Sequence, residues 1–257
     1  MPRTAILLIG LIALVVSPSI GPAQELTLSV AISMKEAIEE IGERFHGTHP
    51  KAVIRYNFGS SGELQKQIEA GAPVDVFVAA AERQMDALER RGLIVSGSRR
   101  TFARNALSVI VPADSRLAVT GPADLLRPQV VRIAMGNPKS VPAGQYAEES
   151  LRALGLWQSV HAKLVFGENV RQVLEYVARG EVEAGFVYVS DVAARGSLIR
   201  EAFRPPPGSY TSVTYPAAIV VGSRHPTLGE ALIALLLSGE GQAVLGRFGF
   251  QSASRAR

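Results

Sequence analysis

The hydrophobic pattern of this chain changes repeatedly between short alternating runs and longer amphipathic runs. Residues 25–31 alternate apolar with small polar side chains, which predicts a strand, and Ser33-Met34-Lys35-Glu36 then predicts a serine-capped helix that continues through Phe45. Further strands are predicted over 52–58, 75–79, 106–111, 130–135, 164–166, 183–189 and 217–221. Further helices are predicted over 61–70, 82–91, 141–154, 168–180 and 227–237. This alternation indicates an α/β fold with mostly parallel sheets and right-handed crossovers.

Residues 59–75 combine a helix-start signal with a helix-stop signal. Ser60 is followed three residues later by Glu63, which predicts a capping box, and Gly71 stands where a left-handed C-cap glycine belongs. Such a turn places the hydroxyls of Ser60 and Ser61, together with free backbone amides, at the positive end of a helix dipole. Taken alone, the pattern also fits an ordinary serine-capped helix. Taken with the other helix starts, it predicts an anion site.

Four of the predicted helices begin directly after a strand. Their starts are Ser33, Ser60-Ser61, Val141-Pro142-Ala143-Gly144 and Glu168-Asn169-Val170. Ligands of open α/β sheets bind at the carboxyl ends of the strands, where the helices begin. Two α/β units with two such starts each therefore offer hydroxyl and backbone N–H donors to one small anion. A charge-assisted hydrogen bond contributes about 1.5–3 kcal/mol, so about six of them are expected to offset the desolvation of a dianion.

The N-terminus has the pattern of a secretory signal peptide. Arg3 precedes an uncharged apolar run over 5–16, and small residues follow as far as Ala23, so the predicted leader is residues 1–23. No other run approaches the roughly 20 apolar residues that a membrane span needs. The mature protein is therefore expected to be soluble in the periplasm, without a stable membrane anchor.

Composition narrows the chemistry further. The 257-residue chain has 47% hydrophobic residues, no cysteine and a formal net charge of +4, of which the predicted leader contributes Arg3. The absence of cysteine excludes disulfides, thiolate chemistry and a lipid attached through an N-terminal cysteine. Dense basic runs occur at Arg90-Arg91 and Arg99-Arg100 without interleaved aromatic residues, so no nucleic-acid partner is expected. The mild positive charge suits an anionic ligand.

Other site chemistries have less support in the sequence. The four histidines show no close metal-ligand pairing, and His46 and His49 are interpreted as residues of a solvated loop. Gly59-Ser60-Ser61-Gly62 lacks the Gly-x-Ser-x-Gly spacing of a hydrolase nucleophile, and a Walker phosphate loop is absent. Tyr188, at the carboxyl end of an apolar strand, is either a core residue or a ligand.

Several segments together resemble the periplasmic molybdate-binding proteins of ABC importers, the ModA family. The resemblance covers essentially the whole mature chain. Its most specific segments are Gln67-Ile68-Glu69-Ala70-Gly71-Ala72-Pro73-Val74-Asp75-Val76-Phe77, Val141-Pro142-Ala143-Gly144-Gln145-Tyr146-Ala147 and Val187-Tyr188-Val189-Ser190-Asp191, with Tyr215-Pro216 and Arg247-Phe248-Gly249-Phe250 also matching. Each segment is modest alone, and their order and spacing carry the resemblance.

The resemblance implies an α/β fold of two doubly wound lobes joined by two crossing strands, the architecture of type II periplasmic binding proteins. The first lobe is expected to hold residues 24–104 and 216–257, and the second lobe residues 105–215. The last strand and helix then return to the first lobe, which periodicity alone does not show.

The resemblance also implies the ligand-binding groups. They are the hydroxyls of Ser33, Ser61 and Tyr188 and the backbone amides of Ala143 and Val170. Ser60 is the less favoured alternative to Ser61. Such groups bind the oxygens of molybdate and make no direct bond to the metal. The chain departs from the family at Lys35-Glu36, where members often carry Thr-Asn, so additional side-chain donors are not expected there and ligand selectivity is left open.

The implied function is high-affinity binding of molybdate and tungstate, with delivery to an ABC permease and, through it, an ATPase. We expect a monomer that is not an enzyme and has no cofactor. Donors without a nearby acceptor favour a fully deprotonated dianion, whereas the proton of hydrogen phosphate needs an acceptor. Sulfate and phosphate remain alternative ligands, and an enzyme on the same scaffold is disfavoured because no nucleophile–base pair is visible. Iron would call for a tyrosine or histidine cluster. An organic carboxylate would usually call for an arginine clamp, and Arg171, beside a donor loop, is expected to point along its own helix.

Overall fold

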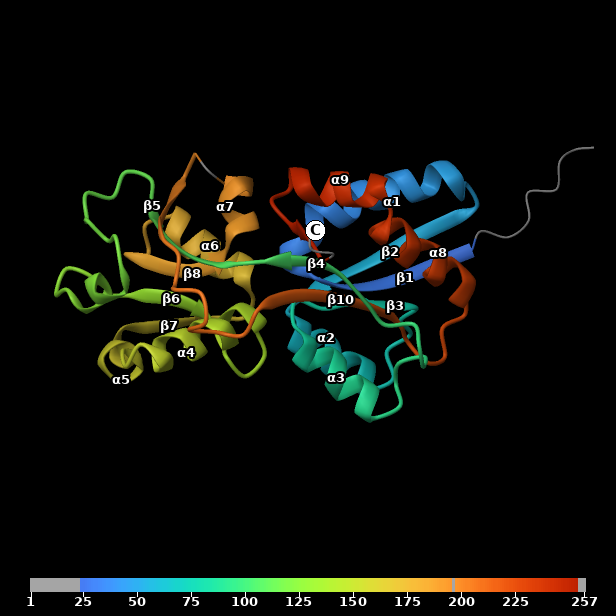
Figure 1. Cartoon of the computed structure of the whole chain (residues 1–257), viewed down its shortest axis with the longest axis horizontal. Helices are drawn as coiled ribbons and strands as arrows, with labels where there is room; N and C mark the ends of the chain where they lie inside the picture. Colours follow the sequence, from blue (N-terminus) through green and yellow to red (C-terminus); the bar gives the residue numbers. More distant parts are fainter. Residues whose placement is uncertain (1–23, 196, 254–257) are drawn as a thin grey trace, which may run out of the picture.

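Two β-sheets, each covered by helices on both faces, lie side by side along the long axis of the molecule (Figure 1). The computed structural model describes residues 24–195 and 197–253, and the predicted signal peptide, residues 1–23, lies outside them. The arrangement confirms the predicted α/β class with two doubly wound lobes.

The first sheet has the strand order β11-β4-β10-β3-β1-β2. Its parallel part consists of β1 (Gln24–Ala31), β2 (Ala52–Gly59) and β3 (Val76–Val78). Antiparallel pairing then adds β10 (Val213–Ile219), β4 (Arg100–Asn105) and β11 (Gln251–Ser252). Leu26, Leu28 and Val30 of β1 are fully buried, so β1 forms the centre of this lobe's core.

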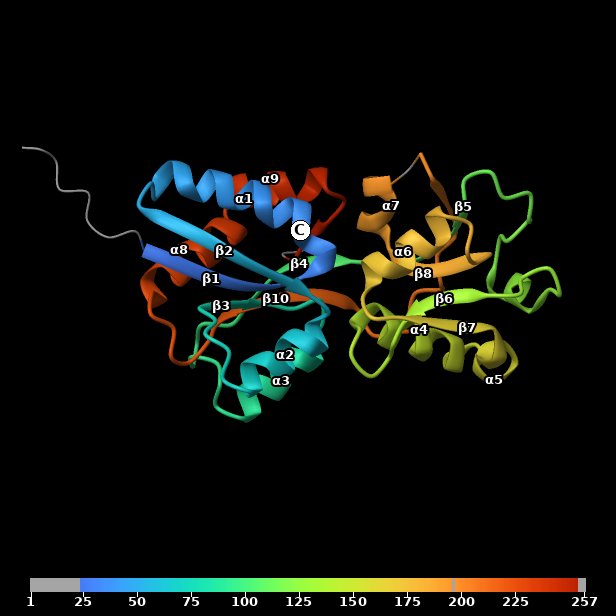
Figure 2. The ribbon, with the colours of Figure 1, turned by 180° about the vertical axis from the view of Figure 1, so that it is seen from behind.

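Helices cover both faces of the first sheet. One face carries α1 (Lys35–Thr48), α8 (Pro226–Leu237) and α9 (Gly239–Arg247), and the other carries α2 (Ser61–Glu69) and α3 (Glu82–Arg90), as both views show (Figures 1 and 2). In the described part of the chain no single helix is long and apolar enough to cross a membrane; α8 and α9 reach that length and composition only as a pair, which is bent by 64°.

The second sheet has the strand order β7-β6-β8-β5-β9. Its strands are β5 (Leu107–Pro112), β6 (Ile133–Gly136), β7 (Leu164–Gly167), β8 (Ala184–Tyr188) and β9 (Ile199–Phe203). The helices are α4 (Pro142–Ala153) and α5 (Trp157–Val160) on one face and α6 (Val170–Ala178) and α7 (Val189–Arg195) on the other (Figure 1). β6, β7 and β8 are parallel, whereas β5 pairs antiparallel with both of its neighbours. Short 3₁₀ helices occur at η1 (Ile32–Met34), η2 (Pro122–Leu126) and η3 (His161–Lys163).

The chain passes between the two sheets twice. The first passage is abrupt, because only Ala106 separates the end of β4 from the start of β5. The second passage runs over residues 204–212, between β9 and β10, and contains the proline segment 205–207. The backbone N–H of Leu107 donates to the hydroxyl of Tyr210 over 3.1 Å, which ties the two passages together. The lobe limits near Arg104 and Tyr215 remain predictions.

Most of the predicted helix ends follow their sequence signals. Ser60 and Glu63 form the predicted capping box of α2, and Asn169 caps α6 by accepting from the Gln172 amide over 3.0 Å. Gly71 has φ +85°, the left-handed conformation that its place after α2 requires.

The prediction that Ser33 caps the first helix was wrong. α1 begins only at Lys35, after the turn η1, and no side chain caps either element. The hydroxyl of Ser33 lies 3.3 Å from the hydroxyl of Tyr215 instead. This contact turns the serine away from its own helix and toward the space between the lobes.

Candidate functional site

A small cavity lies between the lobes, at the carboxyl ends of β1, β2 and β8. In this arrangement of the lobes it offers about 10 Å³ to the centre of a water molecule, roughly the room that one water needs, so it is too small for an organic ligand. None of the residues that line it carries a formal charge. They are Ala31, Ile32, Ser33, Gly59, Ser60, Ser61, Ala80, Val141, Pro142, Val170 and Tyr188.

The structure brings four of the five predicted ligand residues to this cavity: Ser33, Ser61, Val170 and Tyr188. The fifth, Ala143, does not line it. Ala143 is fully buried as the second residue of α4, directly after Pro142, which does line the cavity. A larger hollow of about 430 Å³ lies against the first lobe, lined by Glu82, Arg104 and other residues, and none of the five predicted ligand residues lines it. The small cavity is the candidate site because donors from both lobes converge on it.

Ser60 and Ser61 have different hydrogen-bond partners. The hydroxyl of Ser60 donates to the Glu63 carboxylate over 2.9 Å and closes the capping box, so its proton is already used. Ser61 Oγ accepts a hydrogen bond from the Ala80 amide over 2.9 Å, which leaves its own proton for another acceptor. Because Ser61 is also buried, the proton that it can donate lies within the cavity wall.

Tyr188 contributes a hydroxyl that has no hydrogen-bond partner among the described residues. The side chain is 1% exposed, and a buried polar group without a partner costs about 1–3 kcal/mol. Burial, and then the neighbouring Tyr215, raise the pKa of Tyr188 well above its ordinary value, so the group stays a neutral O–H donor at physiological pH. The Tyr188 hydroxyl at the cavity wall can therefore donate a hydrogen bond to a ligand.

The position of Tyr188 is fixed by the start of α7. The backbone N–H of Tyr188 donates to the carboxylate of Asp191 over 2.9 Å, the second half of a capping box. Asp191 is 1% exposed, and its burial raises the pKa of the carboxyl to about 6. The tyrosine is thus held at the junction between β8 and α7 while its ring reaches the cavity.

Backbone amides at helix starts add further donors. The first amides of any helix have no acceptor within that helix, and they lie at the positive end of its dipole. α4 has no side-chain cap, and Pro142 at its first position has no N–H, so Ala143 carries the first free amide of that helix. In α6 the cap Asn169 bonds the amide of Gln172, which leaves the amide of Val170 free for a ligand. The cavity is therefore bordered by donors that bring no net charge.

The lobes are in direct contact around the cavity. The Gly62 amide in α2 donates to the backbone oxygen of Ser140 in the second lobe over 2.9 Å. A Cβ atom at Gly62 would lie 2.4 Å from that oxygen, so the approach requires glycine. Gly144 plays the same part inside the second lobe, because a Cβ there would lie 1.9 Å from the Gly136 oxygen. Both glycines let backbone approach backbone where the donors converge.

The charged side chains Arg171 and Lys35, near the cavity, contact other residues of the protein. Arg171 reaches across to the first lobe and forms an ion pair with Glu36 at 2.8 Å, so the prediction that it points along its own helix was wrong. Lys35 lies 5.8 Å from the centre of the Phe58 ring. No group of three or more His, Asp or Glu side chains within the described ranges is placed to hold a metal ion. The chemistry available at the site is hydrogen-bond donation to an anion.

Comparisons with known proteins agree on one kind of protein. Residues 26–251 match the family model described as bacterial extracellular solute-binding protein. The chain is 37% identical over 227 residues to the putative ABC transporter substrate-binding lipoprotein YvgL of Bacillus subtilis, which covers 88% of this chain and 85% of YvgL. It is 35% identical over 233 residues to the molybdate-binding protein ModA of Escherichia coli, covering 88% of each. The solved periplasmic molybdate-binding protein of Azotobacter vinelandii superposes with a TM-score of 0.80 at 25% identity, over 88% of this chain and 98% of that one.

Proposed function

Because the chain belongs to the bacterial extracellular solute-binding protein family, we propose that it binds a tetrahedral dianion, molybdate or tungstate, and delivers it to an ABC transporter. The observation that carries the proposal is the unpartnered hydroxyl of Tyr188 at an uncharged cavity between two lobes. The Escherichia coli relative and the Azotobacter structure are named as molybdate-binding proteins, which supports this choice of anion.

The strength of binding follows from the donors. We assign the hydroxyls of Ser33, Ser61 and Tyr188 and the amides of Ala143 and Val170 as ligands of the anion's oxygens. A hydrogen bond to a charged group contributes about 1.5–3 kcal/mol, and nanomolar affinity needs only about 12 kcal/mol net. The dianion's charge is balanced by oriented dipoles, because no lysine or arginine lines the cavity.

The same donors supply selectivity against protonated anions. No carboxylate lines the cavity, so the proton of hydrogen phosphate lacks a strong acceptor there. Molybdate, tungstate and sulfate are fully deprotonated near neutral pH, and their separation depends on size. Sulfate is therefore the ligand that competes most closely with molybdate in this proposal.

The cellular role rests on the sequence and on the family. We propose that residues 1–23 are cleaved and that the mature protein diffuses freely in the periplasm as a monomer. The relative YvgL is named as a lipoprotein, whereas this chain has no cysteine through which a lipid is attached in that way. The transport partner is then a membrane permease coupled to an ATPase. A mature protein that kept residues 1–23 and stayed in the membrane fraction would contradict this role.

Isothermal titration calorimetry of residues 24–257 with molybdate, tungstate, sulfate and phosphate tests the proposed ligand. We expect tight one-to-one binding of molybdate and tungstate, weaker binding of sulfate and no measurable binding of phosphate. Thermal unfolding gives an independent measure, since ligand at a hundred times its dissociation constant stabilises the fold by about 2.7 kcal/mol. Preferred binding of phosphate, or binding of none of the four anions, would refute the proposal.

A further inference from the structure

A chain of polar side chains runs from the two strands that join the lobes, β4 and β10, to the wall of the cavity. Asn105 ends β4, Tyr215 lies in β10, and Ser33 lines the cavity. The Asn105 amide nitrogen lies 3.4 Å from the Tyr215 hydroxyl, which in turn lies 3.3 Å from Ser33 Oγ. Tyr215 is fully buried and Asn105 is partly buried, so the contact between Tyr215 and Ser33 is shielded from solvent.

The direction of each hydrogen bond follows from the orientation of the Asn105 amide. Its oxygen accepts from the Ala106 backbone N–H over 2.9 Å, which turns its nitrogen toward Tyr215 and toward Ser190 Oγ at 2.8 Å. An amide nitrogen only donates, so the Tyr215 oxygen is the acceptor in its contact with Asn105. The proton of Tyr215 is then left for Ser33 Oγ, the other oxygen within reach.

The direction of the Tyr215 hydrogen bond determines where the Ser33 hydroxyl proton points. Once its oxygen accepts from Tyr215, the proton of Ser33 is directed away from Tyr215 and toward the cavity that the serine lines. We propose that Tyr215 and Asn105 are positioning residues, which orient the Ser33 hydroxyl as a donor to the bound anion. The inference rests on the proposed function of the same cavity. It assigns the orientation of the Ser33 hydroxyl to two residues that do not line the cavity.

Local structure supports a specific placement of Tyr215. The pairing of β10 with β4 shifts register between Tyr215 and Pro216, an irregularity of the kind that re-aims side chains within a sheet. The Tyr215 ring packs edge-on against Phe250 at 5.2 Å and against Tyr188 at 6.1 Å. Both contacts use the ring, so Tyr215→Phe retains them and removes only the hydroxyl.

A double-mutant cycle on Ser33 and Tyr215 separates positioning from packing. Molybdate affinity is measured by calorimetry for the wild type, Ser33→Ala, Tyr215→Phe and the double variant. We expect a loss of roughly ten- to a hundredfold for Ser33→Ala and of about three- to tenfold for Tyr215→Phe. In the Ser33→Ala background, Tyr215→Phe is expected to change the affinity by less than about twofold, because a residue that acts through Ser33 has nothing left to orient.

Tyr210→Phe is the matched control. It also removes a tyrosine hydroxyl in the region that joins the lobes, but this hydroxyl bonds the Leu107 amide and has no contact with Ser33. Its affinity for molybdate is expected to equal that of the wild type. Should Tyr215→Phe fail to fold, Asn105→Ala enters the same cycle, since it removes the donor that sets the direction of the Tyr215 proton.

The outcomes are distinguishable. A loss on Tyr215→Phe that is equally large with and without Ser33 would overturn the positioning role and leave the proposed function intact. No loss on Tyr215→Phe in the wild-type background would overturn it as well. A wild-type protein that bound none of the four anions would overturn both the proposed function and this inference.

Discussion

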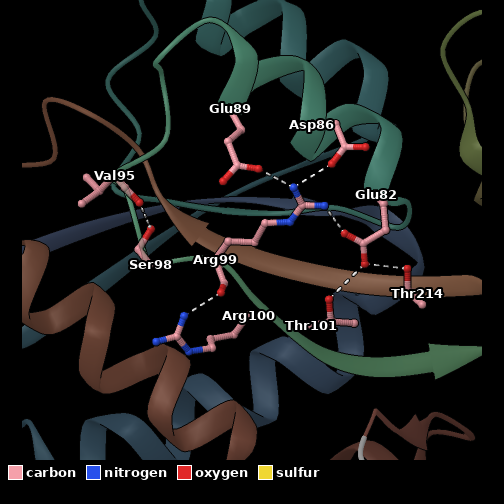
Figure 3. A network of polar contacts seen from close by, with 9 residues as sticks. All are labelled: Glu82, Asp86, Glu89, Val95, Ser98, Arg99, Arg100, Thr101 and Thr214. Carbon is pink, nitrogen blue, oxygen red and sulfur yellow. Dashed lines mark hydrogen bonds and ion pairs between the residues drawn. The ribbon is translucent and has the colours of Figure 1, made fainter.

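Two polar regions, one in the first lobe and one between the lobes, differ in how completely their polar groups are paired. Around Arg99 the structure has a network of charges, in which the guanidinium contacts the carboxylates of Glu82, Asp86 and Glu89 (Figure 3). Burial lowers the pKa of Arg99, but hydrogen bonds to those carboxylates outweigh it and raise the pKa above its ordinary value. At the cavity, in contrast, the wall carries no formal charge, and the Tyr188 hydroxyl has no partner among the described residues.

The difference lies in what each region leaves unsatisfied. Glu82 also accepts from Thr101 over 3.0 Å and from Thr214 over 2.8 Å, so the network ties α3 to both strands that lead between the lobes (Figure 3). Its groups satisfy one another and need no ligand. The cavity holds fewer polar atoms, but its donors still require an acceptor. Unsatisfied neutral donors, and not the density of charge, therefore mark the candidate site.

The largest expected effect concerns Tyr188. Tyr188→Phe deletes a donor to the anion, so molybdate affinity is expected to fall roughly ten- to a hundredfold. The ligand-free protein is expected to become no less stable, because the lost hydroxyl has no partner among the described residues and its desolvation is relieved. Calorimetry measures the first effect and thermal unfolding without ligand the second. A lower melting temperature with unchanged affinity would make Tyr188 a structural residue.

Ser60 and Ser61 provide a matched pair with a similar expected effect. Ser61→Ala is expected to weaken molybdate binding by roughly ten- to a hundredfold and, because it leaves the buried Ala80 amide without its acceptor, to lower stability by about 1–3 kcal/mol. Ser60→Ala removes the α2 cap, so it is expected to lower stability by about 1 kcal/mol and to change affinity by less than about threefold. The same titrations and unfolding curves measure both variants. Reversed results would assign the ligand to Ser60.

Asp191 is a buried carboxyl close to the uncharged site. Its pKa in the folded protein, about 6, lies above the ordinary value of 3.8, so the folded state holds this proton more tightly. The stability that the proton contributes is present below about pH 4 and is lost as the pH rises to about 6. Asp191→Asn keeps an acceptor for the Tyr188 amide and has no such titration. As the pH rises over this range, the wild type is expected to lose about 1–2 kcal/mol of stability that the variant does not lose. The melting temperature of the variant minus that of the wild type is therefore expected to increase. A constant difference from pH 4 to pH 7 would exclude the effect.

The network around Arg99 is expected to matter for stability alone. Arg99→Met leaves three carboxylates without their cation, but the side chain is 23% exposed and solvent screens part of the loss. We expect the free energy of unfolding to fall by about 1 kcal/mol and the molybdate affinity to change by less than twofold. A large loss of affinity would show that the network controls how the lobes meet.

Salt and nearby cations are expected to have small effects on molybdate affinity. Molybdate affinity is expected to fall less than about threefold between low and physiological salt, because buried donors are screened much less than surface charges. Lys35→Ala combined with Arg171→Ala removes the cations nearest the site. That variant is expected to keep molybdate binding within about fivefold of the wild type, since neither cation lines the cavity and the partly exposed Arg171–Glu36 pair contributes about 1 kcal/mol. If it abolished binding while Ser61→Ala and Tyr188→Phe had no effect, countercharge would hold the anion.

Local signals predicted the regular parts of the fold well. The parallel strands β1, β2 and β3 carry apolar runs, and the capping box at Ser60 is visible as a sequence pattern. The strands β4 and β9 were missed because charged residues interrupt the alternation of apolar and polar positions in their short sequences, Arg-Thr-Phe-Ala-Arg-Asn and Ile-Arg-Glu-Ala-Phe. Their pairing comes from partners elsewhere in the chain. α9 was missed because its three glycines disfavour a helix, which forms because Val244 and Leu245 are buried and Ser238 caps it.

The candidate site was less accessible to sequence reasoning than the fold. Ser33, Ser61, Val170 and Tyr188 were identified through strand ends and a family resemblance, and the structure places them at one cavity. The role predicted for Ser33 as a cap failed because its partner, Tyr215, stands 182 positions away. Tyr215 belongs to a segment that carries the family resemblance, but its contact with Asn105 had no local signal, since that contact depends on the return of β10 to the first sheet.

The two chain passages lie together where the lobes join, an arrangement that would serve as a hinge. The strands β4 and β10 are paired up to Asn105 and Val213, and the Tyr210 hydroxyl joins the passages just beyond them. Two neighbouring connections would allow one lobe to rotate relative to the other and would oppose sliding of one lobe along the other. Opening would part Gly62 from Ser140, whereas Ser33 and Tyr215 travel together on the first lobe. The first lobe would then keep the Ser33 hydroxyl oriented whatever the angle between the lobes. An arriving anion would meet the donors of that lobe already in place.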